Sequence, residues 1–112
     1  MNKIVILGRL TKDPELKIVE SNGKVFTKVT LAVDRPFKNE NGERGTDFIP
    51  VIFWGRKAEI ICQYMTKGRQ LSVGGRLQTR SYDGVDGKRK VSIEVVASDF
   101  QFIDKKTAEE IV

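Results

Sequence analysis

The chain contains no histidine and a single cysteine, which removes much of the usual chemistry of enzymes and metal centres. Without histidine, the common zinc sites and imidazole-based acid–base catalysis are not available. Cys62 has no partner for an intramolecular disulfide, as is usual in a reducing compartment. Its neighbours Ile60 and Ile61 indicate a small buried apolar side chain rather than a nucleophile. We therefore expect no catalytic residue, no metal site and no cofactor.

Long apolar segments are also missing. No run of about 18 apolar residues is present, so the sequence predicts no membrane-spanning helix. The apolar stretch near the start ends at Gly8 and Arg9 after four residues, which is too short for a signal peptide. We expect a cytoplasmic protein. With 112 residues, 39% hydrophobic and 31% charged, the composition is typical of one globular domain.

Alternation of apolar and polar residues dominates the chain and predicts β-strands. The predicted extended segments cover residues 3–19, with an interruption near Pro14, and then 24–33, 46–54, 69–82 and 89–103. Residues 34–45 are polar and rich in turn formers, so we expect a long exposed loop there.

One segment follows a different period. Ala58, Ile61, Cys62 and Met65 are spaced as on one face of a helix, which predicts an amphipathic helix over residues 56–66. The order is therefore three strands, a helix and two strands. This is the plan of the OB-fold, a five-stranded Greek-key β-barrel with its helix between strands three and four. We expect an all-β domain with one short helix over residues 1–104, followed by a short charged extension at 105–112.

Several aromatic residues lie among polar and charged neighbours, where a globular core gains little from them. They are Phe37, Phe48 and Tyr82, and a fourth, Trp54, ends the third predicted strand just before Arg56. Exposed rings stack on bases, and a net charge of +5 suits a polyanion, so the pattern indicates a single-stranded nucleic acid as the ligand. The alternative is that these rings are ordinary core or turn residues.

Five segments, taken in order, resemble the bacterial single-stranded DNA-binding protein family. They are Asn2–Glu15, Thr30–Val33, Phe53–Glu59, Tyr64–Gly68 and Gly75–Tyr82. The resemblance covers about residues 2–103 and implies base stacking on Phe37, Phe48, Trp54 and Tyr82. For the phosphates we expect contacts to Arg35, Arg56, Lys57, Lys67, Arg76 and Arg80. Strand parity leaves Phe26 and Phe53 in the core. Phe100 and Phe102 lie on the last predicted strand, and we expect them in the core or an interface.

The same resemblance implies a non-enzymatic protein that binds and protects single-stranded DNA, regardless of sequence, during replication, recombination and repair. It also implies a homotetramer associated with the nucleoid. Ile4–Leu7 is apolar on both faces, and such a strand at a sheet edge favours pairing with another chain. Family members usually continue into a flexible linker and an acidic tip that recruits partner enzymes. The sequence given ends at Val112 with neither, as expected either for a trimmed sequence or for a relative without the tip, so the resemblance leaves the recruitment of those partners open.

Other functions remain open at this point. A dimeric OB-fold replication accessory protein or an RNA chaperone would share the aromatic and basic residues. A small nuclease would need converging carboxylates for a metal ion, and Asp83 and Asp86 on one predicted turn fit this poorly. A purely structural β-domain would bind no nucleic acid at all.

Overall fold

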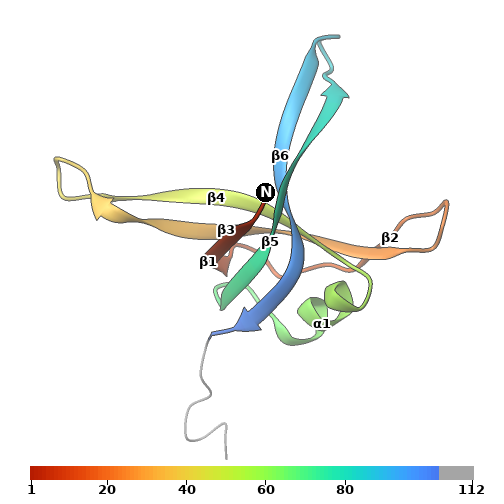
Figure 1. Cartoon of the computed structure of the whole chain (residues 1–112), viewed down its shortest axis with the longest axis horizontal. Helices are drawn as coiled ribbons and strands as arrows, with labels where there is room; N and C mark the ends of the chain where they lie inside the picture. The colour runs from red at the N-terminus through yellow and green to blue at the C-terminus, as the bar shows by residue number, and fades with distance from the viewer. Residues whose placement is uncertain (104–112) are drawn as a thin grey trace, which may run out of the picture.

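The computed structural model describes residues 1–103, so the predicted extension at 105–112 lies outside the described residues. The strands form one sheet in the order β1-β5-β6-β4-β3-β2, which an additional pairing of β1 with β3 closes into a barrel (Figure 1). The elements are β1 (Ile4–Leu10), β2 (Lys17–Ile18), β3 (Val25–Lys38), β4 (Arg44–Trp54), α1 (Arg56–Tyr64), β5 (Gln70–Asp83) and β6 (Arg89–Phe102). Beyond the short β2, five long strands carry one helix between the third and fourth of them. The predicted OB-fold is confirmed.

Alternation along each strand sends every second side chain into the barrel. On β4, Val51 and Phe53 are fully buried while Phe48 and Trp54 are exposed, as the parity of the sequence predicts. The core combines residues from the long strands and the helix: Leu10, Val29, Leu31, Val51, Phe53, Ala58, Ile61, Met65, Leu71, Val73, Val95 and Ala97. Because alternate residues of a strand point to opposite faces, burial of these side chains leaves their neighbours in each strand on the outside of the barrel.

The helix is held close to the end of β4. Gly55 joins the two elements with a φ of 64°, in the left-handed region that favours glycine. Ala58 and Ile61 are fully buried in the core. The helix ends at Tyr64, two residues before the predicted end, and Cys62 is half-buried rather than buried.

The predicted long loop at residues 34–45 is wrong in its backbone, because β3 continues to Lys38 and β4 begins at Arg44. The two strands form an exposed hairpin arm whose turn is closed by a hydrogen bond of 2.7 Å from the Asn39 amide to the Glu43 carbonyl. Strand pairing forms the arm, and an exposed ion pair between Arg35 and Asp47 connects its two strands. The polar composition of residues 34–45 correctly indicated that they are exposed. It does not exclude β-strands, because two polar segments can pair with each other outside the core.

A second hairpin arm is formed by β5 and β6 and extends from the barrel in another direction (Figure 1). Its tip is closed by a hydrogen bond of 2.8 Å from the Gly84 amide to the Lys88 carbonyl, which confirms the predicted turn. At the base of this arm the register shifts between Gly74 and Gly75. A Cβ at Gly75 would collide with the backbone carbonyl of Val96, so the strands can approach this closely because residue 75 is glycine.

Two phenylalanines on β4, one buried and one exposed, should differ in their contribution to the free energy of unfolding. Phe53→Ala should lower the free energy of unfolding by about 3–5 kcal/mol, because it leaves a cavity in the core. Phe48→Ala, at a ring that is 64% exposed, should change it by no more than about 0.5 kcal/mol. Denaturant unfolding of both variants measures the difference. Equal losses would contradict the assigned strand parity.

Candidate nucleic-acid interface

Residues that are paired across neighbouring strands share one face of the sheet. Phe26 is opposite Trp54, Ile52 is level with Val96, and Val96 is opposite Arg76. The side of β5, β6, β4 and β3 that faces away from the barrel interior is here called the outer face. It comprises Phe26, Lys28, Thr30, Ala32, Phe48, Pro50, Ile52, Trp54, Arg76, Gln78, Arg80, Tyr82, Lys90, Ser92, Glu94 and Val96.

The predicted stacking residues are all accessible to solvent. On the outer face, Phe48 is 64%, Tyr82 49% and Trp54 38% exposed. Phe37 is 65% exposed on the β3–β4 arm, beyond a register irregularity between Asp34 and Lys38. Strand pairing therefore brings Phe48, Trp54 and Tyr82 together on one face, and it leaves Phe37 on the arm. Rings with this exposure can stack on unpaired bases.

The assignment of Phe26 to the core is wrong. Its ring is half-buried and lies 5.2 Å from the ring of Trp54, centroid to centroid, with an angle of 40° between the planes. Parity within one strand cannot reveal which of its faces matches that of the next strand, because this depends on the register. The assignment of Phe53 to the core is confirmed, since it is fully buried. Phe26 thus adds an aromatic surface beside Trp54 that the sequence analysis missed.

Phe100 packs against the core, as expected, whereas the expected interface position of Phe102 stays a prediction. Phe100 is half-buried and meets Phe53 edge-on at 5.9 Å between ring centroids. Phe102 is 43% exposed and lies 6.1 Å from the ring of Tyr64. Neither residue belongs to the outer face.

Several of the predicted phosphate contacts are already engaged within the chain. Arg35 donates to both carboxylate oxygens of Asp47, with a shortest distance of 2.8 Å. Arg56 contacts Glu59 at 3.0 Å on α1, and Arg76 donates to Gln78 at 3.1 Å. These groups are exposed, so a phosphate can displace or share their partners at little cost.

Lys57 and Lys67 are exposed and form no ion pair with another residue in 1–103. Lys57 lies in the first turn of α1, close in sequence to Trp54, and Lys67 follows the helix. Strand pairing does not place either lysine on the outer face, which holds Arg76 and Arg80 from the predicted set. The predicted cations are therefore spread over the arm, the outer face and the helix.

Ion pairs at the β3–β4 arm also lower the pKa of two of its carboxyl groups. The hydrogen bond and positive charge of Arg35 hold the pKa of Asp47 below its usual value. Hydrogen bonds from Arg9 and Thr46 lower the pKa of Asp34 in the same way. Both carboxylates stay ionised at neutral pH, so Asp34 remains paired with Arg9 of β1 and Asp47 remains paired with Arg35 of the arm.

A buried carboxylate within the outer face was not anticipated. Glu94 is 2% exposed and accepts hydrogen bonds from Gln78 at 2.7 Å and Arg80 at 3.0 Å, with the Lys28 ammonium at 3.1 Å. Burial raises the pKa of Glu94, but the hydrogen bonds from Gln78 and Lys28 and the two positive charges outweigh it, so the pKa lies below the usual value. The available sequence signal was an acidic residue inside the apolar stretch Ile93–Ala97.

No group of three or more potential metal ligands comes together within residues 1–103. None of the helical segments in this range is long and apolar enough to cross a membrane. The chemistry of the outer face is thus that of flat rings, positive charges and one buried carboxylate.

A closed OB-type barrel with exposed rings and cations on one continuous face defines a nucleic-acid-binding module of the kind that accepts unpaired strands. The model of the single-strand binding protein family matches residues 1–103. The chain is 52% identical over 104 residues to single-stranded DNA-binding protein 3 of Clostridium acetobutylicum, covering 93% of this chain and 72% of the relative.

Two further relatives agree with this match. Single-stranded DNA-binding protein 1 of the same organism is 48% identical, with 95% of this chain and 96% of the relative covered. The single-stranded DNA-binding protein of Clostridium tetani is also 48% identical, with 93% and 71% covered. The chain belongs to the single-strand binding protein family.

The ionised form of Glu94 should contribute to stability. Since its pKa is lowered by folding, this contribution is complete above the ordinary glutamate pKa of 4.5 and is lost as the pH falls through the folded-state pKa. The unfolding free energy of wild type should therefore fall relative to that of Glu94→Gln as the pH drops from the ordinary glutamate pKa through the folded-state pKa. Urea unfolding at a series of pH values tests this. A difference that is independent of pH would contradict a lowered pKa.

Proposed function

We propose that the outer face is the surface on which this protein binds single-stranded DNA without sequence preference. The observation that carries this proposal is the exposure of Phe48, Trp54 and Tyr82 together on one face with Arg76 and Arg80. Stacking suits any base because every base has a flat face, and the cations contact the backbone, which is the same for all sequences. The protein is a binding protein and not an enzyme.

The proposed path extends beyond the outer face. Phe37 and Arg35 lie on the β3–β4 arm, and Arg56 and Lys57 lie in the first turn of α1, next to the end of β4. Lys67 follows the other end of the helix, where its backbone amide donates to Asp13. A strand that leaves the outer face along the arm or past the end of β4 meets the first four of these groups, and it reaches Lys67 by continuing along the helix. Coating of exposed strands during replication, recombination and repair follows from such binding, and an association with the nucleoid in the cytoplasm belongs to the same proposal.

Two observations support self-association through β1. Between Ile4 and Gly8, β1 pairs with β5 on one edge, while its other edge, within residues 1–103, pairs with β3 only at Arg9 and Leu10. Val5 is 67% and Leu7 49% exposed on this strand. An apolar strand with a free edge favours pairing with a second copy of the chain.

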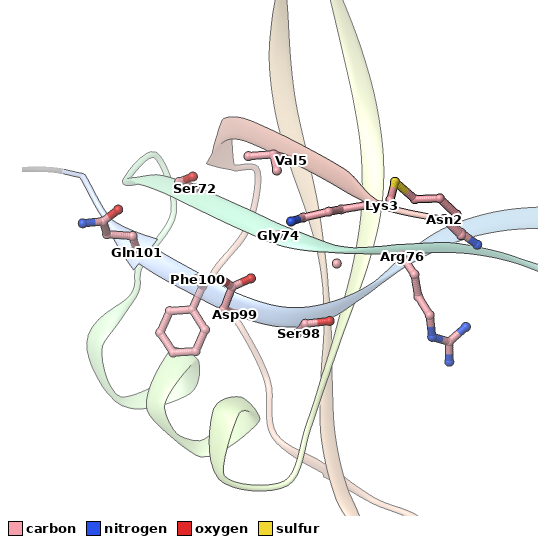
Figure 2. Close-up of a pocket in the computed structure, with 12 residues that line it drawn as sticks. Asn2, Lys3, Val5, Ser72, Gly74, Arg76, Ser98, Asp99, Phe100 and Gln101 are labelled. Carbon is pink, nitrogen blue, oxygen red and sulfur yellow. The ribbon is translucent and has the colours of Figure 1, made fainter.

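Further surface is available for a second contact. Figure 2 shows a hollow along β1, β5 and β6, lined mainly by polar residues such as Ser72 and Asp99, with Val5 and Phe100 beside them. On the β5–β6 arm, Val91 and Ile93 are more than half exposed. They pair with Ser81 and Thr79, so they lie on the side of the arm opposite to Tyr82 and the outer face. Two different contacts of this kind would generate a tetramer of closed symmetry with several outer faces.

The stacking part of the proposal can be tested with Trp54, the one tryptophan of the chain. Its fluorescence should be quenched when an oligomer of dT binds. Trp54→Ala should weaken binding by about 1–3 kcal/mol, the cost of losing one stacked base. Tyr64→Ala removes an aromatic ring that is 56% exposed but outside the outer face, so it serves as the control and should leave the affinity unchanged.

Unchanged Trp54 emission at saturating dT would remove this ring from the site. Competition with an RNA oligomer of the same length distinguishes the favoured function from that of an RNA chaperone. A labelled DNA oligomer incubated with the protein and Mg²⁺ should remain intact, whereas cleavage would indicate a nuclease.

The assembly is tested by light scattering. At micromolar concentration the mass should be about four times the 12.7 kDa of one chain. Val5→Lys should reduce it, because a charged side chain on the free strand opposes pairing with a second copy. Thr79→Lys, opposite Ile93 on the β5–β6 arm, tests the second contact separately. A monomer that still binds long strands tightly would contradict assembly as part of the mechanism.

A further inference from the structure

Glu94 is the one charged side chain among residues 1–103 that is buried. It lies on β6, between the strand that carries Phe48 and Trp54 and the strand that carries Tyr82. A buried carboxylate is costly to desolvate unless it is paired, and a purely structural position here could be filled by an apolar residue. Its location within the proposed binding surface places its negative charge beside cations that a DNA phosphate would contact.

The contacts of Glu94 join two hairpins. Arg80 approaches from β5, next to β6, whereas Lys28 approaches from β3 and must pass over β4 to reach the carboxylate. Ile52, the register partner of Lys28, is 3% exposed although it belongs to the outer face, consistent with the lysine stem covering it. Both cations are thus drawn toward one point of the face.

The two cations remain accessible while they are paired. The side chains of Lys28 and Arg80 are 49% and 56% exposed, so a DNA phosphate can approach either of them from solvent. Such a phosphate meets two positive charges with a fixed negative charge directly behind them. The carboxylate is shielded from water, so its repulsion is screened less than that of a surface carboxylate.

We propose that Glu94 acts as an internal counter-anion of the outer face, which competes with DNA phosphates for Lys28 and Arg80 and limits the electrostatic part of binding. This inference rests on the proposed function. It implies that the affinity depends more on base stacking and less on charge than the number of exposed cations suggests. A strand held in this way is released and exchanged more readily than one held by unopposed cations.

The test compares wild type with Glu94→Gln, which keeps an acceptor for Gln78 but removes the charge. Binding is measured at several salt concentrations with two probes, an oligomer of dT and an abasic strand with the same number of phosphates. One additional neutralised phosphate should steepen the slope of log affinity against log salt by about 0.7. The affinity ratio of variant to wild type should thus rise about 2.5-fold between about 200 mM and about 50 mM salt.

Charge acts on the phosphates alone, so the gain should be similar for dT and for the abasic strand. Glu20→Gln makes the same change in net charge at an exposed residue in the turn before β3, and should leave the slope nearly unchanged. Combining Glu94→Gln with Lys28→Gln should return the slope to that of wild type. If Glu94→Gln does not fold, as judged by circular dichroism, Glu94→Met removes the same charge with an apolar side chain of similar length.

The outcomes are distinct. An unchanged slope in a folded Glu94 variant would overturn the proposal, as would equal steepening in Glu20→Gln. A gain confined to dT would show that Glu94 acts by arranging the rings, which also overturns it. Failure of the wild-type protein to bind dT would instead refute the proposed function itself.

Discussion

The outer face depends on a short parallel junction between β4 and β6. Only Val51 with Val95 and Ile52 with Val96 are paired there within the described residues, yet this contact joins the β3–β4 hairpin to the β5–β6 hairpin. Val51 and Val95 are both fully buried, so burial of apolar surface stabilises the junction from the inside. On the outside, the ion pair between Lys28 and Glu94 spans it. Without this junction the aromatic residues of β4 and β5 would have no common surface.

Much of the architecture could be predicted because it follows from local patterns. Strand periods, the helix spacing and the interruption near Pro14 gave the order of elements, and the parity of β4 separated Phe53 from Trp54. Relations between strands could not be read in this way. The position of Phe26 beside Trp54 depends on register, which several distant contacts determine together. The contact of Lys28 with Glu94 depends in addition on a pairing between residues far apart in sequence.

The cations illustrate a second limit. Composition correctly indicated a basic protein, but it treated every Arg and Lys as an isolated charge. In the structure Arg35, Arg56 and Arg80 each have a carboxylate partner. The exposed pairs of Arg35 and Arg56 contribute little to stability, and their main effect is to orient the guanidinium groups. The pair of Arg80 differs because its partner is buried, so the two kinds of pairing have different consequences for a ligand.

The β5–β6 arm presents two chemically different surfaces on a single pair of strands. Arg80 and Tyr82 project from one side, while Val91 and Ile93 project from the other. Inserting or deleting one residue within either strand would exchange the two sides beyond that point. Relatives of this chain can therefore vary the arm's length freely at the turn near Gly84, but within the strands only by even numbers of residues or with a compensating bulge.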